Sequence, residues 1–296
     1  MSVEIIQERL ATYACKSTLE EEQALREITQ EIIVAGLGRT HLFGRAGFQG
    51  GTCLRIFHGL DRFSEDMDFA LDAPDSSFRL TPYLEGMREE LLVYGYELEI
   101  DDRSRADSPV RQAFVKDDSV GKLLRLGYRP RGGPMRKLRI KLEVDTNPPL
   151  GASYEMPVLD YPFPVAVRTF DLPSLFAGKL HALLCRSYLK GRDWYDFLWY
   201  TARRTPINHT LLSAALDQQG RFKGQAPRTD DAWCVEQLRA MILEHDWKQA
   251  RRDVQRFVKP RELPSLELWS PELFLQRAAR LGERGRHQEP GLEPVP

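Results

Sequence analysis

The sequence predicts an α/β (α+β) protein of two lobes, the first built on a mixed, mostly antiparallel sheet and the second mainly helical. In the first half, Tyr96–Ile100 and Leu138–Asp145 alternate apolar with charged residues, as half-buried strands do. In the second half, apolar residues recur at helical spacing in Leu172–Leu184 and Asp230–Val258. A chain of 296 residues is long enough to give each lobe a core of its own.

The composition is that of an ordinary globular protein, with 42% hydrophobic and 29% charged residues. A net charge of -1 gives no global sign of nucleic-acid binding, although basic patches can exist within a neutral total. No secretory signal and no apolar run long enough to cross a bilayer is present, so no membrane association is expected. The four cysteines are far apart, which argues against a zinc site and favours a cytoplasmic location.

The first elements lead the chain to a glycine turn. Leu19–Ala35 has the pattern of an amphipathic helix with glutamates on its outer face, and Gly36 and Gly38 are expected to end it. His41–Gln49 is expected to be a strand, and Leu80–Val93 a helix after the next strand.

The segment Gln49–Ala70 carries the strongest chemical signal. Gly50 and Gly51 let the backbone turn tightly near a ligand, and Thr52 is expected to cap a helix that receives a phosphate. Asp66 and Asp68 stand at strand spacing, so both carboxylates are expected on one face, where they can hold a hard divalent cation. An ordinary turn and a solvated strand edge are the alternatives.

The strand at Leu138–Asp145 can supply a third carboxylate. Its apolar residues face one way, and Glu143 and Asp145 face the other together with Arg139 and Lys141. If this strand lies beside that of Asp68, one of the two acids completes a three-carboxylate site. Alternatively, both acids pair with the neighbouring basic residues on an exposed face.

The stretch from Arg111 to Lys141 is locally basic and is interrupted by aromatic residues. Such a pattern can hold a polyanion such as RNA, or it can form a hairpin whose charges are solvated. The residues concerned are Lys116, Lys122, Arg125, Arg129, Arg131, Arg136, Lys137, Arg139 and Lys141, with Phe114 and Tyr128.

The proline-rich segment up to residue 164 predicts a linker, giving lobes at 1–164 and 165–282 and a disordered tail at 283–296. In the second lobe, Lys179 lies on a helix otherwise rich in small and apolar residues. Asp193 and Asp196 follow at a spacing that shares one helix face. A salt-bridge network between helices that clamps the lobes together is the alternative to a functional site.

These motifs resemble those of the AbiEii-like (MenT-like) nucleotidyltransferase toxins, a branch of the polymerase-beta-like nucleotidyltransferase superfamily. The resemblance rests on Gly50-Gly51-Thr52, on Arg62 to Phe69, and on Lys179 followed by Arg192-Asp193-x-x-Asp196. Gln49 departs from the family, which often has Lys before the glycines.

The resemblance implies a nucleotidyltransferase-like first lobe and a second lobe that completes the cleft. It implies catalytic roles for Asp66, Asp68, Lys179 and Asp196, with support from Arg192 and Asp193. The nucleotide-binding residues would be Gly50, Gly51, Thr52, Arg62, Ser64 and Lys179. Asp66, Asp68 and Glu143 would bind the metal, and the family strand pattern Lys141-x-Glu143 favours Glu143 over Asp145.

The implied reaction moves a nucleoside monophosphate from an NTP to an acceptor hydroxyl, with Mg²⁺ or Mn²⁺ bound. The family likeness further implies a bacterial toxin of a type IV toxin–antitoxin or abortive-infection system, with a cognate antitoxin and the tRNA 3′ end as acceptor. The donor nucleotide stays open. The alternatives are a small-molecule nucleotidyltransferase and a noncatalytic nucleotide-binding module.

Overall fold

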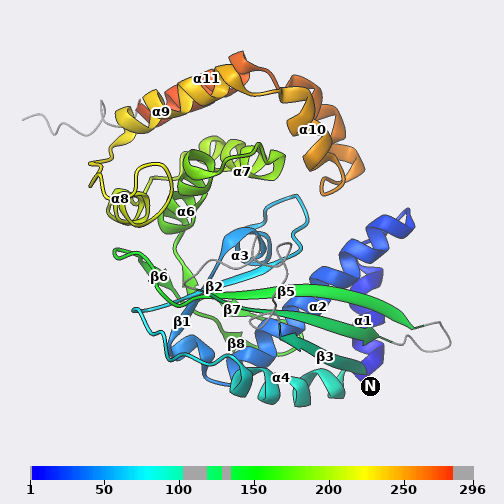
Figure 1. Ribbon diagram of the computed structural model, residues 1–296. Helices are drawn as coiled ribbons and strands as arrows, with labels where there is room; N and C mark the ends of the chain where they lie inside the picture. The colour runs from blue at the N-terminus through cyan, green and yellow to red at the C-terminus, as the bar shows by residue number, and fades with distance from the viewer. Residues whose placement is uncertain (1, 103–118, 129–134, 283–296) are drawn as a thin grey trace, which may run out of the picture. The chain divides into compact units, whose positions relative to one another are not determined.

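The computed structural model describes residues 2–102, 119–128 and 135–282, which form two compact units (Figure 1). The first unit runs to Pro148 and includes Tyr154–Asp171, and the second consists of Pro149–Ser153 and the chain from Leu172 onward. The proline-rich linker predicts a boundary after residue 164, but the boundary between the units lies after Asp171. The reason is that Thr169–Phe170 forms a strand of the first unit's sheet. Of the basic stretch, Phe114, Lys116, Arg129 and Arg131 lie outside the described residues, as does the tail.

The first unit contains a seven-stranded sheet in the order β3-β4-β5-β2-β1-β9-β6. The β2–β5 and β1–β9 pairs are parallel and the others antiparallel, which confirms the mixed, mostly antiparallel sheet. Its strands are β1 (Ala46–Gln49), β2 (Met67–Leu71), β3 (Tyr96–Asp102), β4 (Ser119–Tyr128), β5 (Arg136–Asp145), β6 (Tyr154–Glu155) and β9 (Thr169–Phe170). A separate pair consists of β7 (Val158–Leu159) and β8 (Val165–Ala166).

Helices cover this sheet and extend its core. They are α1 (Ser2–Ala11), α2 (Thr18–Arg39), η1 (Leu42–Gly44), α3 (Gly50–His58) and α4 (Thr81–Val93). In Figure 1, α4 lies below the strands, and α2 packs against it. One sheet face is apolar: Phe48 stacks on Phe69 with ring centroids 4.8 Å apart, and Val144 of β5 is paired with Phe69. The opposite face carries Asp68 and Glu143, because alternate residues of a strand point to opposite faces.

Helix α2 differs from the expected amphipathic helix. It continues through Gly36 and Gly38, because these glycines allow close packing instead of ending the helix: a Cβ at Gly38 would lie 2.5 Å from Val165. The glutamates expected on an outer face are partly internal, since Glu27 and Glu31 are 8% and 4% exposed.

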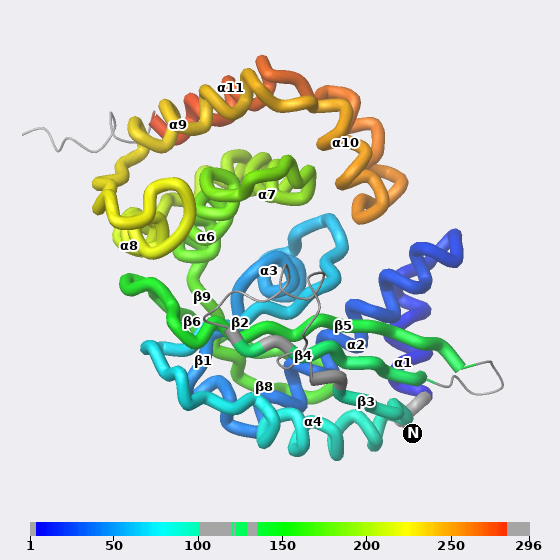
Figure 2. The backbone as a smooth tube through the Cα atoms, in the orientation of Figure 1, coloured from blue at the N-terminus to red at the C-terminus, as the bar shows by residue number. Residues whose placement is uncertain are grey.

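The second unit is helical, as expected, and Figure 2 traces the chain through it. Its core centres on Trp194, whose ring lies 5.1 Å from that of Trp247 and 5.2 Å from that of Phe274. The α8 helix was not predicted. The elements are α6 (Leu172–Cys185), α7 (Gly191–Ala202), α8 (His209–Gln218), α9 (Asp231–Glu244), α10 (Trp247–Gln255), η3 (Pro260–Leu268) and α11 (Pro271–Gly282).

Candidate active site

The glycine turn lies directly against the second aspartate of the Asp-x-Asp pair. Gly50 has φ +78°, and a Cβ at this position would collide with the Asp68 carboxylate. A Cβ at Gly51 would lie 2.8 Å from Arg62 Nη2 and 3.0 Å from Ser64 Oγ. Five of the predicted nucleotide- and metal-binding residues therefore meet at one turn, where the absence of a Cβ on each glycine leaves room for the others: Gly50, Gly51, Arg62, Ser64 and Asp68.

Thr52 has a different structural role from the one expected. Helix α3 begins at Gly50 with Gln49 as its N-cap residue, so the prediction that Thr52 caps the helix is wrong. The Thr52 side chain is fully buried, and its hydroxyl donates to the carbonyl oxygen of Asp66. Asp66 itself precedes β2 by one residue, whereas Asp68 lies within the strand. Thr52 thus connects α3 to the start of the strand that carries Asp68.

The strand register decides which acid of β5 faces Asp68. Asp68 is paired with Glu143 in the parallel β2–β5 ladder, and Asp145 is paired with Ala70. Asp145 also accepts the backbone N–H of Asn147 at 2.9 Å, in a local turn. The register therefore favours Glu143 over Asp145 as the third carboxylate. Its role in metal binding remains a prediction.

The donor set fits a hard divalent cation, because carboxylate oxygens are the preferred ligands of Mg²⁺. In the structure, the Glu143 carboxylate forms an ion pair with Lys141 on the same strand face. Within the described ranges, no three His, Cys, Asp or Glu side chains are arranged to hold a metal. The structure thus has features of both interpretations of the β5 sequence. Glu143 lies opposite Asp68, as a third carboxylate would, and it also pairs with the neighbouring Lys141.

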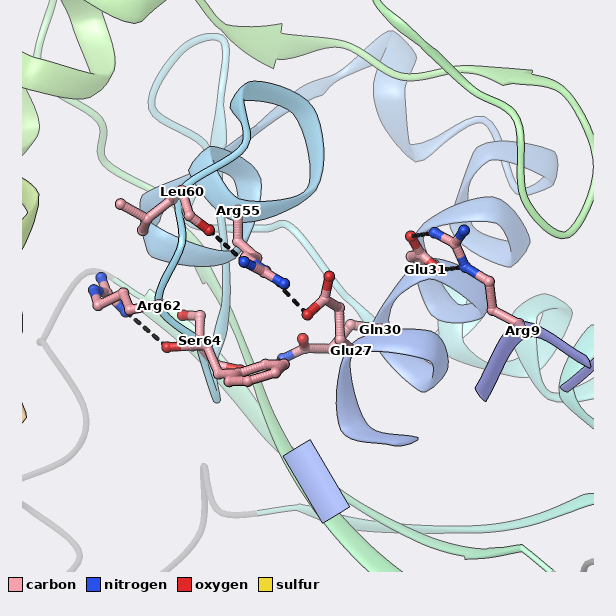
Figure 3. Close-up of polar contacts among 9 residues, drawn as sticks. Arg9, Glu27, Gln30, Glu31, Arg55, Leu60, Arg62 and Ser64 are labelled. Carbon is pink, nitrogen blue, oxygen red and sulfur yellow. Dashed lines mark hydrogen bonds and ion pairs between the residues drawn. The ribbon is translucent and has the colours of Figure 1, made fainter. Parts of the chain in front are cut away.

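Main-chain carbonyls of the loop between α3 and β2 are held by side chains (Figure 3). Arg55 donates to Leu60 O at 2.6 Å and pairs with Glu27 of α2 at 3.0 Å. Arg62, only 3% exposed, donates to Phe63 O at 3.0 Å. The loop that carries Arg62 and Ser64 is therefore fixed from within the unit.

Sequence reasoning missed the residue that supports the last part of this loop, Gln30 of α2. Its side chain is buried and donates hydrogen bonds to the carbonyl oxygens of Ser64 and Glu65, just before Asp66. The only signal in the sequence is weak: Glu27 and Thr29–Glu31 are polar positions interspersed with the apolar Leu25, Ile28, Ile32 and Ile33.

In the second unit, Lys179 of α6 joins both predicted aspartates of α7. Its Nζ lies 2.8 Å from Asp193 Oδ1 and 2.8 Å from Asp196 Oδ2, and Asp196 is fully buried. Arg186 Nε lies 3.2 Å from Asp193 Oδ2. Burial of Asp193 opposes its ionisation, but Lys179, Arg186 and Lys190 outweigh this effect and lower its pKa to about 2.

Lys190 and Arg192 complete the surroundings of this cluster. Burial lowers the pKa of Lys190 to about 8, although the nearby Asp193 carboxylate acts in the other direction. The Arg192 guanidinium lies 4.1 Å from the centre of the ring of Phe257, a residue that follows α10. Lys179, Asp193 and Asp196 are therefore brought together, and they lie in a different compact unit from Asp68. Sequence reasoning missed Arg186 and Lys190.

Part of the basic stretch continues along the face of β5 that carries Glu143. Lys137 and Arg139 are exposed, and Lys141 follows at the same spacing. Arg125 of β4 is exposed and paired with Arg139. By contrast, Lys122 is buried and Arg136 pairs with Glu21 at 2.9 Å. We call Arg125, Lys137, Arg139 and Lys141 the basic row.

Comparisons with known proteins identify the chain's relatives. The model of the nucleotidyl transferase AbiEii toxin family, from type IV toxin–antitoxin systems, matches residues 32–277. The search of curated proteins found no match. No helix in the described part of the chain is long and apolar enough to cross a membrane.

Two solved structures are similar over most of their length. The nucleotidyltransferase toxin MenT4 from Mycobacterium tuberculosis H37Rv aligns with a TM-score of 0.51 and 18% identity, over 92% of this chain and 97% of its own. JHP933 from Helicobacter pylori aligns with a TM-score of 0.48 and 18% identity, over 90% of this chain and 91% of its own. The MenT4 similarity confirms the nucleotidyltransferase-like fold.

Proposed function

Because the chain belongs to the AbiEii family of nucleotidyltransferase toxins, we propose that it transfers a nucleoside monophosphate from an NTP to the 3′ end of an RNA, with tRNA as the acceptor. The acceptor hydroxyl oxygen attacks the α-phosphorus, the bond from the α-phosphorus to the bridging oxygen breaks, pyrophosphate leaves, and the hydroxyl proton passes to solvent. The family also implies a cognate antitoxin. A cytoplasmic location is consistent with this reaction.

One observation carries the proposal: the Gly50–Gly51 turn lies against Asp68, which is paired with Glu143. The turn leaves space for Arg62 and Ser64 beside the first turn of α3, where main-chain N–H groups suit an anionic phosphate. In this proposal, Arg62, Ser64, Gly50, Gly51 and the α3 N-terminus bind the triphosphate. The buried Thr52 acts by fixing Asp66.

Asp66, Asp68 and Glu143 would hold Mg²⁺ or Mn²⁺, which when bound supplies positive charge to the phosphates. Lys141 would exchange its pairing with Glu143 for pairing with phosphate oxygens. The catalytic importance of Lys179 and Asp196 rests on the family resemblance and on their buried ion pairs, and the supporting roles of Arg192 and Asp193 rest on the same grounds.

The basic row favours RNA over a small acceptor. Lys137, Arg139 and Lys141 stand on one face of one strand, and successive members are about 7 Å apart. This spacing is comparable to that of phosphates along a nucleic-acid strand, which is bound mainly through such cations. A neutral or cationic small acceptor gains nothing from this row.

The test is incubation of the wild type and Asp68→Asn with total tRNA, Mg²⁺ and each α-³²P-labelled NTP in turn, followed by a denaturing gel. Asp145→Asn is the matched control, because Asp145 shares the sheet face but is paired with Ala70. Label on tRNA with the wild type and Asp145→Asn, but not with Asp68→Asn, supports the proposal. Absence of label with folded wild type contradicts the RNA acceptor and favours a small-molecule acceptor or a binding module.

A further inference from the structure

A buried amide from α2 holds the main chain immediately before the first aspartate of the site. Gln30 is 1% exposed, and its Nε2 donates to Ser64 O at 3.2 Å and to Glu65 O at 3.1 Å. Figure 3 labels Gln30 on α2 and Ser64 in the loop. Burying an amide is unfavourable unless its hydrogen bonds are made. Both N–H groups of this amide have a carbonyl partner.

The two carbonyls belong to the segment that leads into β2. The next carbonyl, that of Asp66, accepts the Thr52 hydroxyl, and the ladder to β5 begins at Met67. Side chains from α2 and α3 thus hold three successive carbonyls where strand pairing is not yet present. A primary amide suits this position, because its NH₂ offers two donors without adding a charge to the interior.

The other end of the loop depends on the same helix. Arg55 donates to Leu60 O and pairs with Glu27, which lies one turn before Gln30 on α2. Both partners of this ion pair are largely buried, with side-chain exposures of 10% and 11%. Helix α2 therefore supports both ends of the loop that carries Arg62 and Ser64.

We propose that Gln30 is a positioning residue for nucleotidyl transfer, acting through the main chain of Ser64–Asp66 to fix Ser64 and Asp66 without contacting the nucleotide. This inference rests on the proposed function for its link to catalysis. Loss of the amide frees the carbonyls of Ser64 and Glu65, so the main chain that positions Asp66 is held less tightly. Groups that orient metal-binding carboxylates in this way typically contribute about 10–100-fold to metal affinity or activity.

The experiment compares Gln30→Met with Thr29→Val, the matched control. Methionine keeps the length of the side chain but removes both donors. Thr29 is the neighbouring buried polar residue, and its hydroxyl bonds Leu25 O and Tyr96 within the core, away from the loop. Both changes remove a buried polar group from α2, but only Gln30→Met removes contacts with the loop. Comparing the two variants therefore separates general destabilisation from an effect on the site.

The first readout is the rate of NMP transfer, measured at several concentrations of Mg²⁺ and of the tRNA acceptor. Gln30→Met should lower kcat by about 10–100-fold, raise the Mg²⁺ concentration needed for half the maximal rate, and leave the KM for tRNA within about twofold. Thr29→Val should keep the Mg²⁺ dependence of the wild type at a temperature where both variants are folded. Equal behaviour of the two variants would overturn the inference.

The second readout needs no turnover. It is the binding of Mn²⁺ with and without NTP, measured as the decrease in the electron paramagnetic resonance signal of the free ion. Weaker binding by Gln30→Met than by Thr29→Val supports the inference even if the wild type labels no RNA, in which case only the proposed acceptor fails. Unchanged Mn²⁺ binding by folded Gln30→Met overturns it, as does a wild type that binds no Mn²⁺.

Discussion

Gly50→Ala should inactivate the protein mainly by displacing Asp68. The Cβ of alanine would overlap the Asp68 carboxylate, and it would also lie 3.1 Å from the Cβ and Cγ of that residue. Non-bonded heavy atoms need about 3.5 Å, so the carboxylate must move by about 1 Å. Misplacement of about 1 Å at a reacting centre can lower the rate by about 100-fold. We expect a loss of that size in kcat and weaker binding of Mg²⁺.

Gly59→Ala is the matched control on the same helix. Gly59 ends α3 with φ +71°, close to the φ of +78° at Gly50, but a Cβ added at Gly59 would have no heavy atom within 4 Å. Both substitutions therefore impose the left-handed conformation on alanine, at a cost of about 1–2 kcal/mol each. Only Gly50→Ala adds a collision with a site residue.

The assay combines urea unfolding with NMP transfer at several Mg²⁺ concentrations. Gly59→Ala should lose stability but keep its activity and Mg²⁺ dependence when folded, whereas Gly50→Ala should lose both stability and activity. If folded Gly50→Ala retains wild-type activity, the glycine turn is not needed for the position of Asp68 and the reasoning is wrong.

Three further outcomes follow from the charged groups. Lys179→Met leaves Asp193 and Asp196 buried without their lysine, so the free energy of unfolding in urea should fall by about 3–5 kcal/mol. Lys190→Met should instead raise stability at pH 7, by at most about 3 kcal/mol, because the folded protein disfavours the lysine's charge. Folding lowers the pKa of Lys190 from 10.5 to about 8, so the stability gained by Lys190→Met should disappear as the pH rises from about 8 to 10.5. Thermal unfolding of both proteins at pH 7 and pH 10.5 tests this. In the basic row, Lys137→Glu with Arg139→Glu should raise the KM for tRNA about tenfold or more and leave the KM for NTP unchanged, measured at fixed salt.

The elements with strong local signals were predictable from the sequence. Alternation located Leu138–Asp145, and the structure buries its apolar residues as expected. Helices near Leu80–Val93 and Leu172–Leu184 were also confirmed, because apolar residues recur at helical spacing there. The prediction that Gly36 and Gly38 end the helix was wrong. These glycines are accommodated inside α2 because they allow close packing against residues outside the helix, which a local sequence pattern does not reveal.

The sequence predicts candidate site residues, which stay predictions, but it does not predict how they are arranged. Glycines followed by paired aspartates indicate phosphate and metal chemistry without any structure. The role of Thr52 was not predictable, because its partner is a main-chain carbonyl fourteen positions away. The burial of Gln30 was not predictable either, since its partners lie 34 and 35 positions away.

The parallel register of β2 and β5 gives the site its order. Because side chains alternate, a slip of one residue would put Leu142 or Val144 opposite Asp68, and a slip of two would put Lys141 or Asp145 there. The observed register instead pairs Glu143 with Asp68 and sets Lys141 next in line on the same face. Lys137 and Arg139 continue that face, so about 20 Å of one strand connects the exposed cations to the carboxylate. An RNA strand bound along these cations would thus be directed toward the acidic end of β5, and reversal of the charge at Lys137 should weaken long acceptors more than a short one that ends near Lys141.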